Sequence, residues 1–293
     1  MKITIITASY NYENYIKETI QSILNQTYNN WELIIVDDGS KDNSISIIND
    51  YVKKDEWIKL YTHENNSNKG LSETIKLALS KTQTEWVMFL EADDTIAPDY
   101  IEQKIKIIEE NENVNFIFND INILYEDETL IPIYEKYLSQ LREQVKKIGV
   151  PFKLIDLFRN KNCRCFVPTF SCVMLKKELF PTGESNTFKP PVGAWLDCWL
   201  YLQMVDKANC YFINKKLTNW RRHSESYINK PHQELKVISF LINEYKLLHF
   251  YPPILKRILK YSRRYFIKTK PREKEVILFD RFRFVNGVYQ PNK

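Results

Sequence analysis

Carboxylates gather directly after two apolar stretches of this chain, WELIIV at 31–36 and WVMFL at 86–90. They are Asp37 and Asp38 after the first stretch and Glu91, Asp93 and Asp94 after the second. Carboxylates this close repel one another, and a divalent cation relieves that repulsion. Mg²⁺ and Mn²⁺ prefer oxygen ligands, and Mg²⁺ commonly binds one or two carboxylates together with substrate phosphates. Turn and helix-capping roles account for one residue of the first pair but not for both.

Alternating strand and helix patterns must position these groups. We expect strands at Lys2–Thr7, Trp31–Val36, Trp57–Thr62 and Trp86–Leu90, separated by helices at 13–26, 42–54 and 70–81. This order predicts a parallel sheet with helices on both faces. Ligands of such sheets bind beyond the carboxyl ends of the strands. The residues that follow each strand are therefore the candidates for binding.

Polar residues follow all four of these strands. The groups are Thr7, Ala8, Ser9, Tyr10 and Asn11; Asp37, Asp38, Gly39 and Ser40; Asn65 through Gly70, which includes Lys69; and Glu91, Ala92, Asp93 and Asp94. Together they would bring hydroxyls, amides, a lysine and up to five carboxylates to one edge of the sheet. Such a set is typical of an enzyme that binds a phosphate-bearing ligand with a metal ion.

The placement of glycine narrows the class of phosphate enzyme. The first glycine of the chain is Gly39, so there is no glycine-rich loop after the first strand, which excludes a Rossmann dinucleotide site and a sugar nucleotidyltransferase. The P-loop pattern is also absent. A haloacid-dehalogenase-type phosphatase stays a rival, because Glu91, Asp93 and Thr95 resemble its DxDxT motif. Glutamate is a poor substitute for the nucleophilic aspartate of that motif.

Beyond residue 98 the pattern is less regular. We expect helices at 98–110, 134–160 and 194–207, strands at 116–118, 171–175, 211–213 and 217–220, and further helices from 231 onward. The helix at 194–207 is strongly apolar and carries Asp197 between Trp195 and Trp199. Partial burial there should raise the pKa of the Asp197 carboxyl.

Composition favours an intracellular protein with a basic tail. The five cysteines form no CxxC pair, no apolar run approaches the ~18 residues of a membrane span, and the N-terminus lacks a signal-peptide pattern. Residues 230–293 carry fifteen Lys or Arg against five Asp or Glu, hence +10, which leaves −5 of the net +5 for the other 229 residues. The amphipathic stretch 254–268 fits either an anionic membrane surface or packing on the rest of the protein. No nucleic acid partner is expected, because no recognised motif accompanies the basic charge.

Four segments, all within residues 3–100, closely resemble the inverting family 2 glycosyltransferases of the GT-A fold. In chain order they are TASYNYENYIKETIQSILNQTY, WELIIVDDGSKD, NKGLS and EWVMFLEADD, and a weaker similarity covers 165–226. The resemblance implies an α/β GT-A fold with a mixed, mostly parallel sheet flanked by helices. It also implies a catalytic domain at 1–226, with a nucleotide-sugar-binding half at 1–100 and an acceptor-binding half at 101–226, and a C-terminal helical extension at 227–293.

The family pattern implies a role for each candidate residue of the first half. Contacts to the base and ribose are implied for Thr7 and its neighbours Ala8, Tyr10 and Asn11. Asp38 would accept a hydrogen bond from the uracil imide, with Asp37 beside it, and the nucleotide would also approach Lys69 and Gly70. Asp93 matches the last aspartate of the DxD motif, which holds Mn²⁺ or Mg²⁺ against the diphosphate. Glu91 takes the place of the first aspartate, and Ala92 lies between them.

In the second half, LDCWLYLQMVDKANCYFINKKLTNWRRH resembles the acid/base helix of the family and its R-x-H strand. The alignment makes Asp197 the base that deprotonates the acceptor hydroxyl, a role for which a carboxylate is suited. Arg221 and His223 then match R-x-H and would contact the diphosphate, or His223 would bind the metal. Leu196 stands where the family often has glutamate, and Lys76 stands where asparagine is common.

These residues predict a metal-dependent inverting glycosyltransferase. It would move a hexose or N-acetylhexosamine from a nucleoside-diphosphate sugar, most simply UDP-linked, to a hydroxyl of a glycan or lipid-linked acceptor in surface polysaccharide or lipooligosaccharide synthesis. We expect it in the cytoplasm, at the inner face of the membrane if residues 250–270 bind there; the sequence leaves a homodimer open. Glu91 and Leu196 motivate an alternative, a catalytically silent sugar-nucleotide or glycan-binding module.

Overall fold

The structure, a computed structural model, describes residues 1–125, 131–158, 167–180 and 196–223, together with three short strands between 276 and 291. The chain divides into two compact units, which are Met1–Lys189 with Leu196–Ser226 and Pro190–Trp195 with Tyr227–Lys293.

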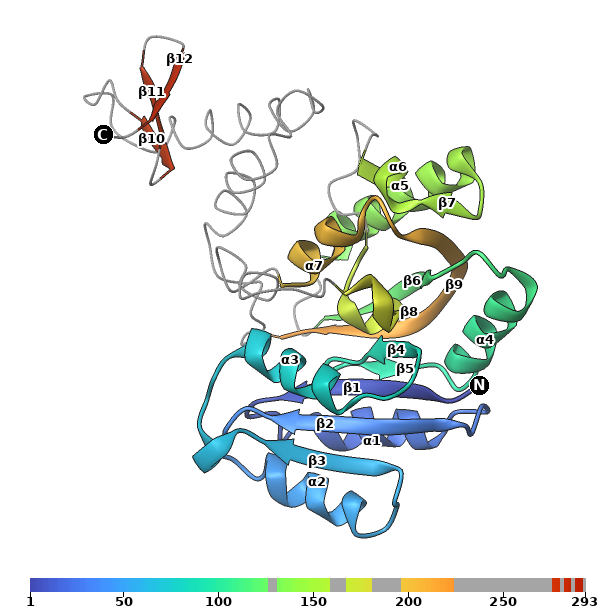
Figure 1. Cartoon of the computed structure of the whole chain (residues 1–293), viewed down its shortest axis with the longest axis vertical. Coiled ribbons are helices and arrows are strands. Elements are labelled where there is room, and N and C mark those ends of the chain that lie inside the picture. The colour runs from blue at the N-terminus through green and yellow to red at the C-terminus, as the bar shows by residue number, and fades with distance from the viewer. Residues whose placement is uncertain are drawn as a thin grey trace. The chain divides into compact units, whose positions relative to one another are not determined.

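Parallel strands and crossover helices form the first hundred residues, as the apolar pattern predicts. The strands are β1 (Ile3–Ser9), β2 (Trp31–Asp37), β3 (Ile58–Thr62) and β4 (Trp86–Phe89), and the helices between them are α1 (Ile16–Leu24), α2 (Ser44–Val52) and α3 (Leu71–Lys81). All three strand pairs in this part are parallel. Figure 1 shows α1 and α2 lying together, apart from α3. The carboxyl ends of β1, β2 and β4 therefore meet at one edge.

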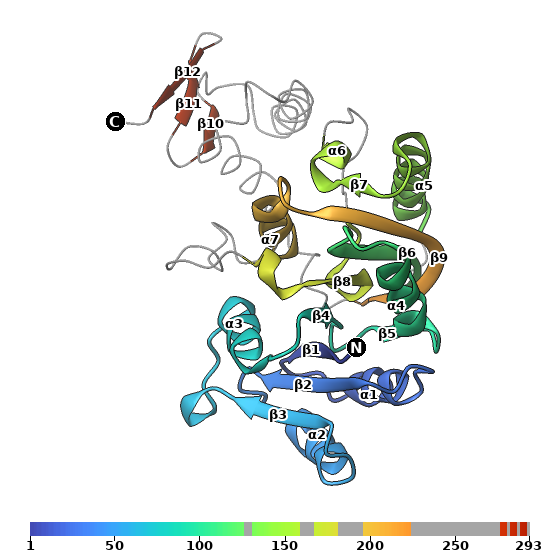
Figure 2. The ribbon, with the colours of Figure 1, turned by 45° about the vertical axis from the view of Figure 1, so that its right-hand side comes forward.

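The second half continues the same sheet with mostly antiparallel strands. Its strands are β5 (Thr95–Ile96), β6 (Phe116–Tyr125), β7 (Phe152–Lys153), β8 (Val173–Lys176) and β9 (Asn209–Arg222). The strand order is β3-β2-β1-β4-β8-β6-β9-β5, with β7 paired to β9. Strand β8 is antiparallel to both of its neighbours, whereas β6 and β9 are parallel. Figure 2 shows β9 as a long, curved strand, which pairs with β6 along much of its length.

Helices and single turns join these strands. They are α4 (Tyr100–Glu110), α5 (Ile131–Ile148), α6 (Leu154–Phe158) and α7 (Leu196–Met204), with 3₁₀ turns η1 (Glu64–Asn66), η3 (Phe170–Cys172) and η4 (Lys177–Leu179). No helix in the described part of the chain has both the length and the apolar character that a bilayer span requires.

Two expectations for the second half are wrong in detail. The helix expected over 134–160 ends at Ile148, because Gly149 adopts a left-handed φ of 85° and Pro151 follows, and both stop a helix. The two short strands expected at 211–213 and 217–220 are one strand, β9. Its pairing with β6 continues through an irregularity at Asp120, which absorbs the polar residues between them.

Strands also replace the expected helices at the end of the chain. Three antiparallel strands, β10 (Val276–Phe279), β11 (Phe282–Val285) and β12 (Val288–Pro291), form a sheet of their own. Alternating residues such as those in FRFV suit a strand better than a helix. The amphipathic stretch 254–268 lies outside the described residues.

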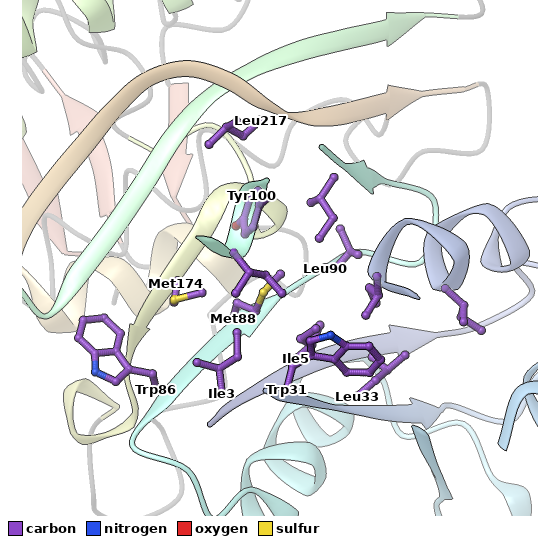
Figure 3. Packing of buried hydrophobic residues seen from close by; sticks show 14 of the residues in the cluster. Ile3, Ile5, Trp31, Leu33, Trp86, Met88, Leu90, Tyr100, Met174 and Leu217 are labelled. Atoms are coloured by element: carbon purple, nitrogen blue, oxygen red, sulfur yellow. The ribbon is translucent and has the colours of Figure 1, made fainter. Parts of the chain in front are cut away.

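One hydrophobic core joins the two halves of the sheet (Figure 3). Ile3, Ile5 and Met88 from the parallel strands are fully buried, and they belong to the same cluster as Tyr100 and Met174 of the second half. Burial of aliphatic and aromatic side chains is the main stabilising term in folding. The core thus fixes the strand ends that carry the polar residues.

Candidate active site

At the end of β2, Asp37 accepts three hydrogen bonds from the residues that follow it. Its Oδ1 accepts the backbone N–H groups of Gly39 at 3.0 Å and Ser40 at 2.8 Å, and its Oδ2 accepts the Ser40 hydroxyl at 2.6 Å. The side chain is fully buried. Asp37 therefore shapes the turn that follows β2, which is the capping role that aspartate commonly fills.

Asp38 ties the β2 end to the loop after β3. Its two carboxylate oxygens accept the backbone N–H groups of Lys69 at 2.6 Å and Gly70 at 2.9 Å. Gly39 allows this close approach, because its φ is +83° and a Cβ there would lie 2.7 Å from the Asn66 carbonyl oxygen. Lys69 and Gly70 thus reach the predicted site through their backbone, while the Lys69 side chain is exposed.

The end of β1 supplies hydroxyls beside this loop. Within the part of the chain that the structure describes, the buried hydroxyls of Thr7 and Ser9 have no hydrogen-bond partner. Asn11 has a left-handed φ of 60°, and its amide oxygen accepts the N–H of Lys41 at 2.8 Å. Ala8 is partly exposed, and Tyr10 is 44% exposed. A buried hydroxyl without a partner is costly, so these atoms can accept or donate a bond to a ligand.

The end of β4 is anchored by its backbone. The Thr19 hydroxyl lies 2.9 Å from the carbonyl oxygens of both Ala92 and Asp94. The Asp94 carboxylate is fully buried and accepts the backbone N–H of Arg221 at 2.8 Å. Asp94 therefore connects β4 to β9, and Ala92 is packed in the core.

Asp93 and His223, the two residues that the sequence analysis considers for metal binding, face each other in the structure. Asp93 Oδ2 lies 3.1 Å from His223 Nε2, and both side chains are buried. The His223 ring packs on Tyr15, with the ring centres 4.9 Å apart. Three or more His, Cys, Asp or Glu groups suited to one metal ion do not come together within the described ranges. A divalent ion here would have to take its other ligands from a phosphate and water.

Arg221 is engaged by the protein itself. Its Nε donates to the Asp93 carbonyl at 2.9 Å, one terminal nitrogen donates to Glu18 at 2.6 Å, and the guanidinium lies 5.0 Å from the centre of the Tyr15 ring. This arrangement joins α1, the β4 end and β9. In this structure Arg221 secures the position of His223 two residues later.

Burial and mutual repulsion raise the pKa values of two carboxyl groups that follow β4, those of Glu91 and Asp94. Burial, followed by the charge of Asp93, raises the pKa of Glu91 to about 8. Burial and the charges of Asp93 and Glu91 also raise the pKa of Asp94. The nearby Tyr12 hydroxyl has a raised pKa for the same two reasons, burial and the acidic group. A cation bound at this place would reduce the repulsion among the carboxylates.

Asp197 lies close enough for its charge to act on Glu91. It is the second residue of α7 and is partly buried, and its charge contributes to the raised pKa of Glu91. Leu196 is buried, so the position where the family often has an acid is filled here by a core side chain. Trp195 lies outside the described residues.

Sequence reasoning missed the residues that hold the candidates in place. These are Thr19, Tyr12, Tyr15, Thr169 and Ser171. Thr169 and Ser171 contact Glu91 from a segment 78 and 80 residues away, a distance that no local pattern spans. Tyr15 immediately precedes α1, and no local sequence pattern indicates its contact with His223.

Comparison with known proteins agrees with this arrangement. The sequence profile described as Glycosyl transferase family 2 matches residues 4–180. The putative teichuronic acid biosynthesis glycosyltransferase TuaG of Bacillus subtilis is 29% identical over 251 residues, which cover 85% of this chain and 90% of TuaG.

Solved structures share the fold. S. aureus TarS 1–349 in complex with UDP-GlcNAc superposes with a TM-score of 0.63 and 17% identity, covering 93% of this chain and 74% of TarS 1–349. The mannosyltransferase PcManGT of Pyrobaculum calidifontis, in complex with GDP-Man and Mn²⁺, gives 0.58 and 16%, covering 89% and 68%. The family match, the fold and the converging strand ends lead to one conclusion: the chain is a glycosyltransferase of family 2 with the GT-A fold.

Proposed function

We propose that this glycosyltransferase moves a hexose or N-acetylhexosamine from a UDP-sugar to a hydroxyl of a glycan or lipid-linked acceptor, with inversion at the anomeric carbon. The observation that carries the proposal is the buried Asp93–His223 pair at a strand end crowded with carboxylates. TarS, which shares the fold, binds UDP-GlcNAc. Residues 1–226 would form the catalytic domain and residues 227–293 an extension to it.

The nucleoside would lie against the ends of β1 and β2. The unpartnered hydroxyl of Thr7 and the buried carboxylate of Asp38 support this placement. Asp38 already accepts two backbone N–H groups, but a carboxylate has about four acceptor positions, so it can also accept the uracil imide. Further contacts are proposed for Ala8, Tyr10, Asn11, Asp37, Lys69, Gly70, Glu91, Ala92 and Arg221.

A divalent ion, Mn²⁺ or Mg²⁺, would be held by Asp93 and His223 against the diphosphate. Their atoms fit this role, because an oxygen and a neutral imidazole nitrogen suit Mn²⁺ and face each other. The ion would supply positive charge for the leaving nucleoside diphosphate. Arg221 and Tyr15 hold His223 in position, and PcManGT, another protein of this fold, binds Mn²⁺.

Asp197 would deprotonate the acceptor hydroxyl as that oxygen attacks the anomeric carbon. Its charge reaches Glu91 at the β4 end, so the carboxylate lies near the place proposed for the donor. A carboxylate within hydrogen-bond reach of a hydroxyl is suited to this step. Attack from the face opposite the leaving group gives a β-linked product from an α-linked donor.

The acceptor would belong to a surface polysaccharide or lipooligosaccharide, in line with the name of TuaG. An acceptor on a lipid would place the enzyme at the inner face of the cytoplasmic membrane. Residues 250–270 would then supply the membrane contact through their basic charge. Co-sedimentation with anionic liposomes, with and without residues 250–293, tests this part; equal binding by both proteins refutes it.

A silent sugar-nucleotide-binding module is the second candidate. Leu196 favours it, because a buried core residue replaces an acid beside the proposed base. A panel of nucleotide sugars with Mn²⁺ and release of UDP as the readout separates the two. Release from one donor supports the transferase, whereas tight UDP binding without release from any donor supports the module.

A further inference from the structure

The η3 turn and the preceding Thr169 hold Glu91 by two hydrogen bonds, although they lie far from it in the sequence. The Thr169 hydroxyl donates a 2.5 Å hydrogen bond to Oε2 of Glu91, and the backbone N–H of Glu91 donates to the Ser171 hydroxyl at 2.9 Å. Thr169 is 3% exposed and Ser171 is fully buried. The turn thus holds both the side chain and the backbone of the strand-end acid.

Two other elements fix the turn itself. From α4, the Tyr100 hydroxyl donates to the Ser171 carbonyl at 3.0 Å, and Lys104 Nζ donates to the Cys172 carbonyl at 2.7 Å. From β9, the Thr218 hydroxyl donates to the same Ser171 carbonyl at 3.2 Å. A group whose support is locked on several sides keeps one orientation. The Thr169 hydroxyl is therefore a fixed donor.

The hydrogen bond depends on the length of the acid. An aspartate at position 91 would carry its carboxyl about one carbon–carbon bond, roughly 1.5 Å, nearer to the backbone. Its oxygen would then lie beyond the hydrogen-bond range of the Thr169 hydroxyl. The longer side chain at position 91 and the threonine at 169 fit as a pair.

We propose that Thr169 is a positioning residue, which holds Glu91 so that its second oxygen, Oε1, accepts a hydroxyl of the nucleotide-sugar donor. This inference rests on the proposed function. Oε2 accepts the hydrogen bond from Thr169, so Oε1 is the oxygen of Glu91 that this bond leaves for the donor. Thr169 orients the acid, and Glu91 makes the contact with the donor.

Steady-state kinetics of Thr169→Val with the donor identified by the panel test the proposal. Valine keeps the branched shape and loses the hydroxyl. Leaving a buried acceptor without its donor costs enough free energy for a tenfold to hundredfold effect, so we expect the donor KM to rise about tenfold or more, with kcat within about threefold. Thr169→Ser should restore a donor KM close to that of the wild type. An unchanged donor KM in Thr169→Val overturns the proposal.

A matched control separates positioning from packing. Thr82 is also 3% exposed, and its hydroxyl donates to the Ala78 carbonyl at 3.0 Å at the end of α3. Thr82→Val should lower the melting temperature about as much as Thr169→Val and leave the donor KM unchanged. If Thr169→Val does not fold, Thr169→Ala takes its place with the same expectation.

A double-mutant cycle gives the second readout. Glu91→Asp should raise the donor KM by a similar factor, and adding Thr169→Val to it should change little, because the hydrogen bond is already lost. Factors that multiply in the double variant would contradict the pairing. If the wild type transfers sugar but the two substitutions change the donor KM independently, only this inference is refuted. If the wild type transfers no sugar from any donor, the proposed function is refuted.

Discussion

The carboxylates at the end of β2 and those that follow β4 differ in their hydrogen bonding. Asp37 and Asp38 accept five hydrogen bonds from backbone N–H groups and a hydroxyl, and those bonds shape two loops. At the β4 end the carboxylates of Glu91, Asp93 and Asp94 are buried beside one another, and the pKa values of Glu91 and Asp94 are raised. Each carboxylate of the first pair accepts at least two hydrogen bonds from the protein, whereas Asp94 of the second group keeps a buried oxygen without a partner among the described residues.

This difference indicates a division of work. A carboxylate that is surrounded by backbone N–H groups stabilises the fold around it. Buried carboxylates with few hydrogen-bond donors repel one another, and the fold holds them together at a cost in free energy. A bound cation lowers that cost. We therefore expect changes at the β2 end to affect stability first, and changes at the β4 end to affect transfer first.

Asp93→Ala should produce the largest effect, a loss of transfer of about 10³-fold, because it removes a proposed ligand of the metal that balances the leaving diphosphate. The measurement is UDP release with the preferred donor, Mn²⁺ and acceptor. Circular dichroism should show a folded protein. Turnover like that of the wild type in a folded Asp93→Ala protein would remove the β4 end from the mechanism.

Asp197→Asn should reduce kcat by at least about 10²-fold, since asparagine keeps the shape of the side chain but cannot take a proton. Binding of UDP, measured by calorimetry, should stay within about threefold of the wild type. A variant that keeps its kcat would show that another group, or water, takes the proton from the acceptor.

Asp37→Ala tests the other side of the comparison. It leaves the buried N–H groups of Gly39 and Ser40 without their acceptor, so the free energy of unfolding should fall by about 3 kcal/mol. Chemical denaturation measures this change. If Asp37→Ala lowers the free energy of unfolding by less than Asp93→Ala does, the roles assigned to the two strand ends are reversed.

Glu91→Gln should have the smallest effect, a gain in stability whose size depends on pH. The folded protein holds a proton on Glu91 up to pH about 8, above the pKa of an unfolded glutamate, so this group lowers stability as the pH rises from about 4.5 to 8. Without added metal, Glu91→Gln should be more stable than the wild type by at least about 1 kcal/mol at pH 8 and nearly equal to it at pH 4. A constant difference at both pH values would show that Glu91 keeps an ordinary pKa.

The sequence allowed accurate prediction of the parallel half of the fold and of the polar strand ends. Those strands have regular apolar runs, and parallel topology brings their ends together whatever lies between them. The contacts that complete the site come from separate segments: Tyr15 on His223, and Thr169 on Glu91. Such contacts depend on tertiary packing. The prediction of helices was wrong at 276–291, where the structure has strands. The basic and polar residues of that segment made its alternating strand pattern hard to recognise.

Binding of Mn²⁺ in the presence of saturating UDP tests the central claim most directly. The free Mn²⁺ signal in electron paramagnetic resonance gives the number of bound ions. The proposed site predicts one Mn²⁺ per chain for the wild type and for Thr82→Val, and loss of that ion in both Asp93→Ala and His223→Ala. Equal Mn²⁺ binding by the wild type and Asp93→Ala, or no Mn²⁺ binding by the wild type, would contradict the account.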